Sequence, residues 1–422
     1  MGELRVVVVG GGIAGLVAAT EIARGGRGCL LLEAATKLGG RARTRVLDGF
    51  HFNMGPHALY ADGALHGMLR EWGVDVSGGG PDLSTAVALW GGSLHPLPAR
   101  LSPKASPPLD SQSSAALVAQ FKRIAAGEYD ERGKALSSVT RALPRAARTV
   151  VEALVRVTSY VHAPDLLDAK AALDQVRKSF GGVLYLDGGW RGLIDGLAAA
   201  ASAAGAELRT AHRVTTVSRS DTGWCIEVPL HALERADAVV LAVPPREANE
   251  LARDVEGLGT IAANLRPARI AGLSLGLLPG VHPRANFALG MTEPTYFSVH
   301  SSTARLAPEG GMLAHIARYL APDERPRADS ETELEGLADV FLPCWRSVEV
   351  RRQRQVGMIV AHDIPSWSAQ GRRARGQFTN APGLFVAGDW VGDEGMLADA
   401  AAASGRAAAR RALSFLAALP PR

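Results

Sequence analysis

Three glycines near the start of the chain have the spacing of a phosphate-binding turn. Gly10, Gly12 and Gly15 follow a run of four valines and form the pattern G-x-G-x-x-G. In this pattern the first glycine permits a tight turn, the second lets a pyrophosphate approach the backbone, and the third lets a helix pack against the strand. The N-terminus of that helix offers N–H groups and a positive dipole end. We therefore expect Ile13 and Ala14, in its first turn, to contact a bound dinucleotide.

An acid at the end of the second apolar run supports this interpretation. The run CLLLE ends at Glu33, eighteen residues after Gly15, and Ala34 follows it. A carboxylate at this place accepts hydrogen bonds from the ribose hydroxyls of an adenosine and would repel a 2′-phosphate, which disfavours NADP. We assign Glu33 and Ala34 to the nucleotide site. The alternative is an exposed acid at the end of a strand.

A second glycine pair, Gly39 and Gly40, follows soon after the ribose acid, and Arg41 comes next. A nicotinamide site has no need of this pair, whereas the extended body of a flavin dinucleotide would run over such a loop. Arg41 has the charge to neutralise a pyrophosphate. A surface arginine with no ligand is the alternative.

The C-terminal region contains a matching feature. An apolar run over 384–387 stops at Gly388 and Asp389, and an alanine-rich helix is predicted after it. A carboxylate at the carboxyl edge of a parallel sheet can accept hydrogen bonds from ligand hydroxyls. Backbone N–H groups near Met396 and Leu397, at the predicted start of the helix, could stabilise negative charge on a bound ring. The two ends of the chain are thus predicted to form one cleft.

These motifs carry a family resemblance. The segments VVVVGGGIAGLVAA, LLEAATKLGGRART and LFVAGDW resemble those of the FAD-dependent amine oxidase, protoporphyrinogen oxidase and phytoene desaturase superfamily. The resemblance implies non-covalently bound FAD. It implies that Asp389 meets the ribityl and pyrophosphate region and that the backbone of Val214 meets the adenine. A segment similar to one in the desaturases, GFHFNMGPHALY, places Gly55, Pro56 and His57 near the flavin.

The predicted fold class is α/β, with a Rossmann-like FAD-binding domain on a parallel sheet and an inserted mixed α+β substrate domain. Residues 1–60, 181–250 and 358–422 are assigned to the FAD-binding domain, and residues 61–180 and 251–357 to the substrate domain. Helices are expected near 114–126 and 137–160. A strand pair is expected over 207–217.

The resemblance also shapes the expected chemistry. Amine oxidases of the superfamily use a lysine near the flavin, but this chain has no lysine after Lys178 and has Ala271-Gly272 at the matching place. Met396 stands where those enzymes place an aromatic residue beside the flavin. Trp367 is a candidate for substrate contact, with a packed core tryptophan as the alternative. His57 is a candidate general acid or base, with a structural histidine as the alternative.

The expected function is removal of a hydride from a C–C or C–N bond of a largely apolar small molecule. A terpenoid or carotenoid-like compound, a porphyrinogen and an intermediate of secondary metabolism remain open as substrates. A flavin-dependent amine oxidase is one alternative. A non-catalytic lipid- or prenyl-binding protein of the same fold is the other.

Composition limits the partners. The net charge of the 422 residues is +4, and the three cysteines form no CxxC pair, so neither a nucleic acid nor a metal is indicated. No apolar run reaches the roughly 18–20 residues of a membrane span. A cytoplasmic protein is expected. The arginine clusters at 351–354 and 372–375 are interpreted as a solvated face, with a peripheral contact with phosphate or membrane headgroups as the alternative.

Overall fold

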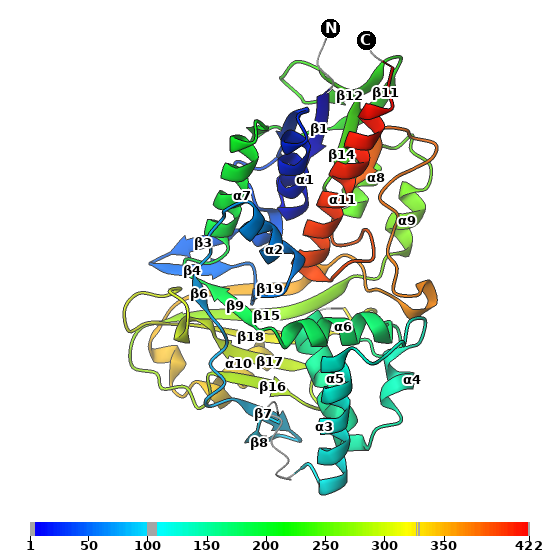
Figure 1. The fold of residues 1–422 in the computed structure, drawn as a ribbon. Coiled ribbons are helices and arrows are strands. Elements are labelled where there is room, and N and C mark those ends of the chain that lie inside the picture. Colours follow the sequence, from blue (N-terminus) through cyan, green and yellow to red (C-terminus); the bar gives the residue numbers. More distant parts are fainter. Residues whose placement is uncertain (1–4, 99–107, 326, 328–329, 421–422) are drawn as a thin grey trace.

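The computed structural model describes residues 5–98, 108–325, 327 and 330–420. A five-stranded parallel sheet, in the order β10-β2-β1-β14-β20, forms the upper half of Figure 1. Four of its strands are short, mostly apolar and largely buried, as expected for a parallel sheet covered on both sides, whereas the edge strand β10 is polar and partly exposed. They are β1 (Arg5–Val9), β2 (Gly28–Leu32), β10 (Glu207–Arg209), β14 (Ala238–Leu241) and β20 (Leu384–Val386).

Helices cover one face of this sheet and a smaller sheet covers the other. The first face packs against α1 (Ile13–Arg24), α7 (Arg191–Ala203) and α11 (Leu397–Ala417), with α2 (Ala64–Glu71) beside them. The second face packs against a group of shorter elements: β11 (Thr216–Ser220), β12 (Gly223–Glu227), β13 (Glu234–Ala236), α8 (Pro245–Leu251) and α9 (Leu258–Asn264). These layers confirm the predicted α/β fold with its parallel sheet.

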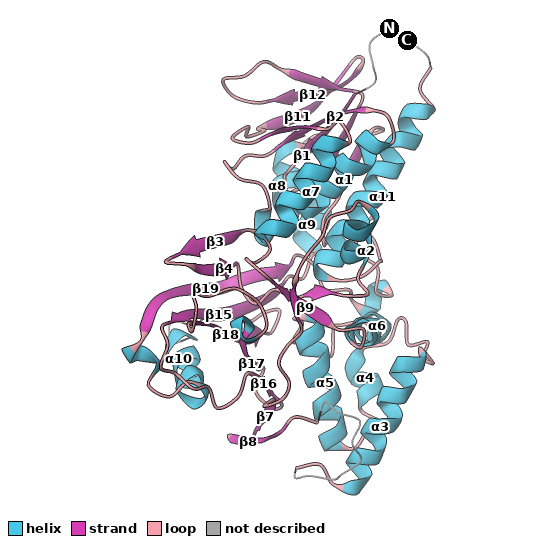
Figure 2. Ribbon diagram, turned by 60° about the vertical axis from the view of Figure 1, so that its left-hand side comes forward, coloured by secondary structure: helices cyan, strands magenta, loops and turns pink. Residues whose placement is uncertain are grey.

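A seven-stranded mixed sheet, in the order β19-β15-β18-β17-β16-β7-β8, forms the lower half of Figure 1. Its strands are β7 (Val87–Trp90), β8 (Ser93–Pro96), β15 (Ala268–Leu277), β16 (Phe287–Gly290), β17 (Thr295–Val299), β18 (Met312–Leu320) and β19 (Glu349–Ala361). One face packs against α10 (Ser330–Phe341), and Figure 2 shows this helix on the side away from the parallel sheet. The helices at one end are α3 (Ser111–Ala126), α4 (Leu136–Thr140), α5 (Arg145–Ser159) and α6 (Ala169–Ser179).

Short strands lie between the two large sheets. They are the pair β3 (Thr44–Leu47) and β4 (Phe50–Asn53), and the group β5 (Leu59–Tyr60), β6 (Gly78–Gly79) and β9 (Val183–Leu186). This region brings the chain from the glycine loops of the upper half to the seven-stranded sheet of the lower half. The division into two domains stays a prediction, which the separate sheets support.

One local prediction was wrong. Residues 207–217 do not form a strand pair, because β10 joins the parallel sheet beside β2 while β11 pairs with β12. The helical structure expected near 137–160 is confirmed as two helices, α4 and α5, since Pro144 lacks the backbone N–H that a helix interior needs and α5 begins directly after it. Most of the proline-rich segment 96–108 lies outside the described residues. Among those described, no helix combines the length and apolar character needed to cross a bilayer.

Candidate functional site

A cavity of about 480 Å³ lies at the carboxyl ends of the central parallel strands, where ligands bind in open α/β sheets. Val9 and Leu32, the last residues of β1 and β2, contribute to its wall, as does Ala242 just after β14. Its volume falls within the range of about 300–1,000 Å³ that is usual for small-molecule sites. Most predicted cofactor residues line it: Gly10, Gly12, Ile13, Ala14, Glu33, Ala34, Gly39, Gly40, Arg41, Gly55, Pro56, His57, Val214, Gly388, Asp389 and Leu397.

The three glycines of the first loop have different surroundings. Gly10 has a positive φ of 106°, and a Cβ atom there would lie 2.5 Å from Ala242 O. Gly15 does not line the cavity; a Cβ on it would lie 1.8 Å from Gly10 O, so only glycine lets α1 pack this closely. A Cβ on Gly12 would meet no atom within 4 Å, and a Cβ on Gly40 would lie 3.6 Å from Gly12 Cα. The backbone is therefore bare where Gly12 and Gly40 approach each other.

Glu33 anchors the loops at one end of the cavity. Its Oε2 accepts a hydrogen bond from Gly11 N at 2.7 Å, and its Oε1 accepts one from Ala35 N at 2.7 Å. The backbone N–H of His212 donates to Glu33 O at 2.9 Å. That contact brings the loop after β10, which carries the buried Val214, to this end of the cavity.

Asp389 joins three segments of the chain. Its Oδ1 lies 2.9 Å from Arg41 Nη2 and 2.9 Å from His362 Nδ1, and its Oδ2 accepts from His362 N at 3.0 Å. Burial opposes ionisation of this carboxyl, but the Arg41 guanidinium and His362 outweigh burial and hold its pKa well below the usual range. Arg41 also donates to Val360 O at 2.8 Å. The predicted pyrophosphate arginine is thus paired with the predicted ribityl acid, and the contacts of both with FAD stay predictions.

The turn before α11 depends on small residues. Gly388 has a φ of 151°, and its N–H donates to Ser404 Oγ at 2.9 Å, while that hydroxyl donates back to Gly388 O. A Cβ on Gly405 would lie 2.3 Å from Ala14 O. The close approach of α1 and α11 therefore brings the two ends of the chain to one cavity.

Met396, which was predicted to lie beside the flavin, does not line the cavity. It is 4% exposed and packs in the apolar cluster that α3–α6 share with the seven-stranded sheet. Its neighbour Leu397 packs against the same cluster, lines the cavity and has a positive φ of 56°. A contact of Met396 with the flavin stays a prediction.

His57 lies on the cavity wall, and its role as a general acid or base stays a prediction. Gly55, with a φ of 98°, turns the backbone, and His57 Nδ1 lies 3.0 Å from Gly55 O. The imidazole ring packs 4.9 Å from the ring of Trp190. Burial is the main cause that lowers the pKa of His57, so the ring is neutral at physiological pH. If Nδ1 donates its proton to Gly55 O, Nε2 is the basic atom of the ring.

Trp367 is not a packed core tryptophan, and its predicted contact with the substrate stays a prediction. Its side chain is 42% exposed, and its indole N–H donates to Asp165 O at 3.0 Å. It does not line the cavity and it is not in the core. A hydrogen bond to a surface loop therefore explains its position.

Several lining residues were missed in the sequence: Tyr60, Tyr160, Trp190, Met358, Ile359, Val360 and His362. They belong to segments far apart in the chain, and although Tyr60 ends the quoted segment GFHFNMGPHALY, no motif assigned any of them to the cavity. Tyr160 is an example of how such a residue is positioned at the cavity. Its hydroxyl donates a hydrogen bond to Pro56 O, which connects the end of α5 to the loop that carries His57. Only packing of the two halves of the molecule brings these residues to the cavity.

These residues fit an extended dinucleotide. The bare backbone at Gly12 faces the N-terminus of α1, whose first turn contains no acid, so it suits a pyrophosphate. Glu33 and Val214 stand at one end for an adenosine. The described residues contain no cluster of metal-ligating side chains.

Comparisons with known proteins agree with this geometry. The family model of flavin-containing amine oxidoreductases matches residues 13–266, more than half of the chain. An oxidoreductase from Methanosarcina mazei has a similar structure, with a TM-score of 0.77, 18% identity, and coverage of 96% of this chain and 99% of that one.

Two curated relatives match over short segments. A carotenoid 3,4-desaturase of Haloarcula japonica is 55% identical over 51 residues, which are 12% of this chain and 10% of its own length. An L-amino-acid oxidase of Demansia vestigiata is 43% identical over 70 residues, which are 16% of this chain and 13% of its own length. The match of the family model over residues 13–266 is much longer than either of these segments. It shows that the chain belongs to the flavin-containing amine oxidoreductases and is an FAD-dependent enzyme.

Proposed function

We propose that this enzyme removes a hydride from a C–C or C–N bond of a largely apolar small molecule. The observation that carries the proposal is the cavity wall outside the glycine loops. Its side chains are mostly apolar or aromatic: Met54, Leu59, Tyr60, Tyr160, Trp190, Met358, Ile359 and Leu397. Such a wall stabilises an apolar substrate by removing its surface from water, at about 25 cal/mol per Å².

Two carboxylates of the cavity, Asp389 and Asp399, already have cationic partners. Asp399, which is 2% exposed in its side chain, forms an ion pair with Lys178 at 2.8 Å and accepts from Leu65 N at 3.1 Å. Arg41 and Asp389 are paired with each other. A substrate ammonium would have to compete with these internal cations for a carboxylate. This supports an uncharged reacting region.

Bound FAD supplies the hydride acceptor. The chain's own residues then have three tasks. The apolar wall holds the reacting C–H bond and excludes water, Tyr160 fixes the Pro56 carbonyl and with it the loop of His57, and His57 Nε2 takes the proton that leaves the substrate. A neutral histidine suits this role, because one of its two ring nitrogens carries no proton before the reaction.

The relatives support two substrate classes. The short match to a carotenoid desaturase favours a terpenoid or carotenoid-like molecule, although a porphyrinogen or an intermediate of secondary metabolism fits the same wall. The match to an L-amino-acid oxidase supports amine oxidation as the second candidate. Both comparisons cover mainly a short segment, so the cavity wall is the stronger argument for the first.

A screen under anaerobic conditions tests the proposal. Oxidised holoprotein is mixed with polyenes, porphyrinogens, alicyclic acids and amines, and loss of the flavin's visible absorbance is followed. We expect bleaching by an uncharged, largely apolar compound. Bleaching by amines alone would replace this function with amine oxidation.

The role of His57 is tested with the compound that reduces the flavin. His57→Gln should slow flavin reduction by about 100- to 10,000-fold with unchanged FAD content. Because the pKa of His57 is lowered, the wild-type rate should stay constant as the pH falls through about 6.5 and decrease only below it. His66→Gln is the matched control, since His66 Nδ1 bonds similarly to Ala61 O at 2.9 Å outside the cavity. Equal rates in the two variants would remove His57 from the mechanism.

A further inference from the structure

The face of the seven-stranded sheet that is turned toward the cavity lies beneath residues 50–57. Along β15, Gly276 packs beneath Phe50 and Phe52, since a Cβ there would lie 3.0 Å from the Phe50 ring. At the other end, a Cβ on Gly55 would lie 2.8 Å from Met358 Cε, and Met358 pairs with Ile270. The side chains of this face between the two ends therefore lie beneath the loop that carries Met54 and His57.

A β-bulge in β19 places an additional polar side chain on this face. Gln355 pairs with Gly272 and Met358 pairs with Ile270, so three residues of β19 span two of β15. Gly357, with a φ of 65°, supplies the left-handed backbone within the bulge. In a regular strand, residues three apart point to opposite faces, but the extra residue puts Gln355 and Met358 on the same one.

Gln355 is buried without a hydrogen-bond partner. It is 7% exposed, and neither Oε1 nor Nε2 has a partner among the described residues. Its amide lies over Gly272, where a Cβ would come within 2.7 Å of Oε1. A buried amide without partners destabilises the folded protein, so the amide of Gln355 calls for a partner that completes its hydrogen bonds.

Two buried histidines on the same side of the sheet as Gln355 also have a ring nitrogen without a hydrogen-bond partner among the described residues. His315 is fully buried and uses Nδ1 for a 2.8 Å hydrogen bond with Ser274, which leaves Nε2 without a partner among the described residues. His300 packs 4.4 Å from it and likewise has an unpaired Nδ1. Burial lowers the pKa of His315 to about 3 and that of His300 well below its usual value. Both rings are therefore uncharged donors or acceptors.

This arrangement favours a particular kind of ligand group. Gln355 and His315 stand on the two strands that flank β15, and Gly272 places no side chain between them. The adjacent row contains Met358, which lines the cavity and has a flexible thioether side chain. Neutral amide and imidazole groups suit a carbonyl, hydroxyl or amide, whereas an ion would remain buried without a counter-charge.

We propose that Gln355 determines substrate specificity by binding an uncharged hydrogen-bonding group of the substrate, with His315 Nε2 as a second partner. The inference rests on the proposed function, since it assigns the polar end of the largely apolar substrate. The substrate would then carry one neutral polar group, reached past Met358, in addition to its apolar body.

Four probes with one phenyl ring test this: benzamide, benzyl alcohol, benzylamine and benzoate. Each is titrated into the holoprotein, and the shift of the flavin's visible spectrum reports binding. Benzamide and benzyl alcohol should bind wild type about 10-fold more tightly than the two ions, and Gln355→Leu should remove that advantage. Gln112→Leu, the same change on the exposed face of α3, should bind all four as wild type does.

Urea unfolding of the same holoproteins separates binding from structure. Replacing an amide without partners by an apolar side chain of similar size should leave the midpoint of Gln355→Leu equal to or above that of wild type. A lower midpoint would show that the amide is a structural group and would overturn the proposal. Equal affinities for the four probes, or no spectral response at about 10 mM, would also overturn it.

This outcome is independent of the proposed reaction. The titration needs bound flavin but no turnover, and flavin reduction is measured separately with candidate substrates. If no apolar compound reduces the flavin while benzamide binding still depends on Gln355, the proposed function fails and the polar site remains. If an apolar compound reduces the flavin but benzamide binding does not depend on Gln355, the proposed function stands and the polar site is overturned.

Discussion

At the scale of single residues, Gly12 is the position where the requirements of folding can be told apart most clearly from those of cofactor binding. Its φ of −79° is open to any residue, and a Cβ atom on it would meet nothing within 4 Å. Gly15, three residues later, has no such space, because a Cβ there would collide with Gly10 O. The space at Gly12 therefore has no role in packing, and a ligand's close approach explains it.

We predict that Gly12→Ala folds normally but loses FAD. The new methyl group would project into the space between Gly12 and Gly40, where a pyrophosphate would approach the backbone. FAD affinity should fall by at least about 10-fold, while the unfolding midpoint of the apoprotein stays unchanged. Affinity is measured by titrating apoprotein with FAD and following flavin fluorescence.

Gly67→Ala is the matched control for this prediction. A methyl group on Gly67, in α2, would likewise meet no atom within 4 Å, and this residue lies outside the cavity. The variant should retain full FAD affinity. Full affinity in Gly12→Ala as well would show that the pyrophosphate binds elsewhere.

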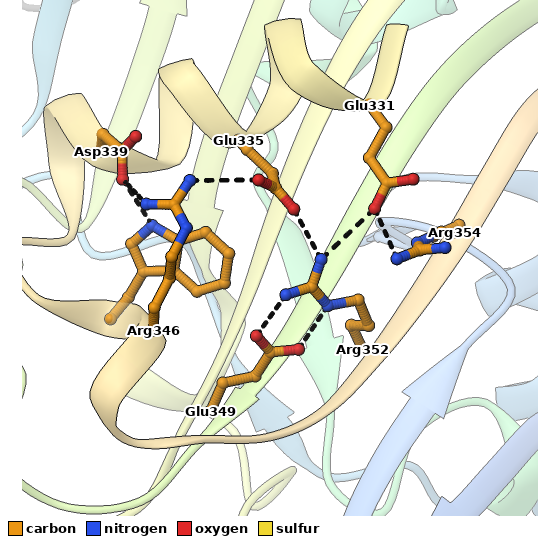
Figure 3. A network of polar contacts seen from close by, with 8 residues as sticks. Glu331, Glu335, Asp339, Arg346, Glu349, Arg352 and Arg354 are labelled. Carbon is orange, nitrogen blue, oxygen red and sulfur yellow. Dashed lines mark hydrogen bonds and ion pairs between the residues drawn. The ribbon is translucent and has the colours of Figure 1, made fainter. Parts of the chain in front are cut away.

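Among the elements, α10 and β19 are joined by a network of charges (Figure 3). Arg352 forms a two-pronged contact with Glu349, and its Nη1 lies 2.6 Å from Glu335 and 3.3 Å from Glu331. Arg354 pairs with Glu331 at 2.6 Å. Acids of the same chain already pair with Arg352 and Arg354, and the contact with membrane headgroups, which was the alternative for these arginines, stays untested. The network attaches α10 to the sheet.

Arg352→Met should weaken this attachment. The side chain of Arg352 is 25% exposed, so its contacts are partly shielded from solvent. We expect a loss of about 1–2 kcal/mol in the free energy of unfolding, and a smaller loss in high salt. Urea titrations at low and high salt measure both quantities, and FAD content should not change.

Arg305→Met serves as the control for the network. Arg305 also pairs with an acid, Asp187, at 3.0 Å, but its side chain is 83% exposed. Its loss should cost less than about 1 kcal/mol. If the two variants were equally stable, the network would contribute no more than an ordinary surface pair.

In the molecule as a whole, buried neutral histidines set the response to acid. Burial is the main cause that lowers the pKa of four of them: His57, His162, His300 and His315. Below pH 6.5 the unfolded chain binds protons at these positions that the folded chain does not bind, so stability falls as the pH falls. Asp363 acts in the opposite direction, because burial raises its pKa to about 6 and its folded form takes up a proton first.

We predict a marked loss of stability between about pH 6.5 and 4.5, beyond what a protein without such histidines would show. Each histidine contributes up to about 1.4 kcal/mol per pH unit in this window, less the opposing term from Asp363. Urea unfolding of the holoprotein across the window measures the slope. His315→Gln, which cannot be protonated, should reduce the slope by about one proton. An unchanged slope would mean that His315 is charged in the folded protein.

Much of the cofactor cavity was predictable because its determinants are local. A buried strand, a glycine turn and a helix form one continuous segment, and the carboxyl ends of parallel strands meet at one edge. Glu33 and Asp389 end such strands, so their type and position were enough to bring them to the cavity. The absence of a lysine from β15 could also be read from the sequence, but the position of Gln355 over Gly272 could not.

What tertiary structure alone decided is where segments from different parts of the chain meet. Hydrophobic periodicity locates a strand, but a bulge changes which face a side chain occupies, and nothing in the pattern of β19 shows that Gln355 and Met358 share one. The positive φ of Leu397 is a backbone conformation of the same kind. The sequence determined the glycine turn and the edge of the sheet at which the cavity lies. Packing of the two halves determined the wall that faces the substrate, because that wall is built from contacts between residues hundreds of positions apart.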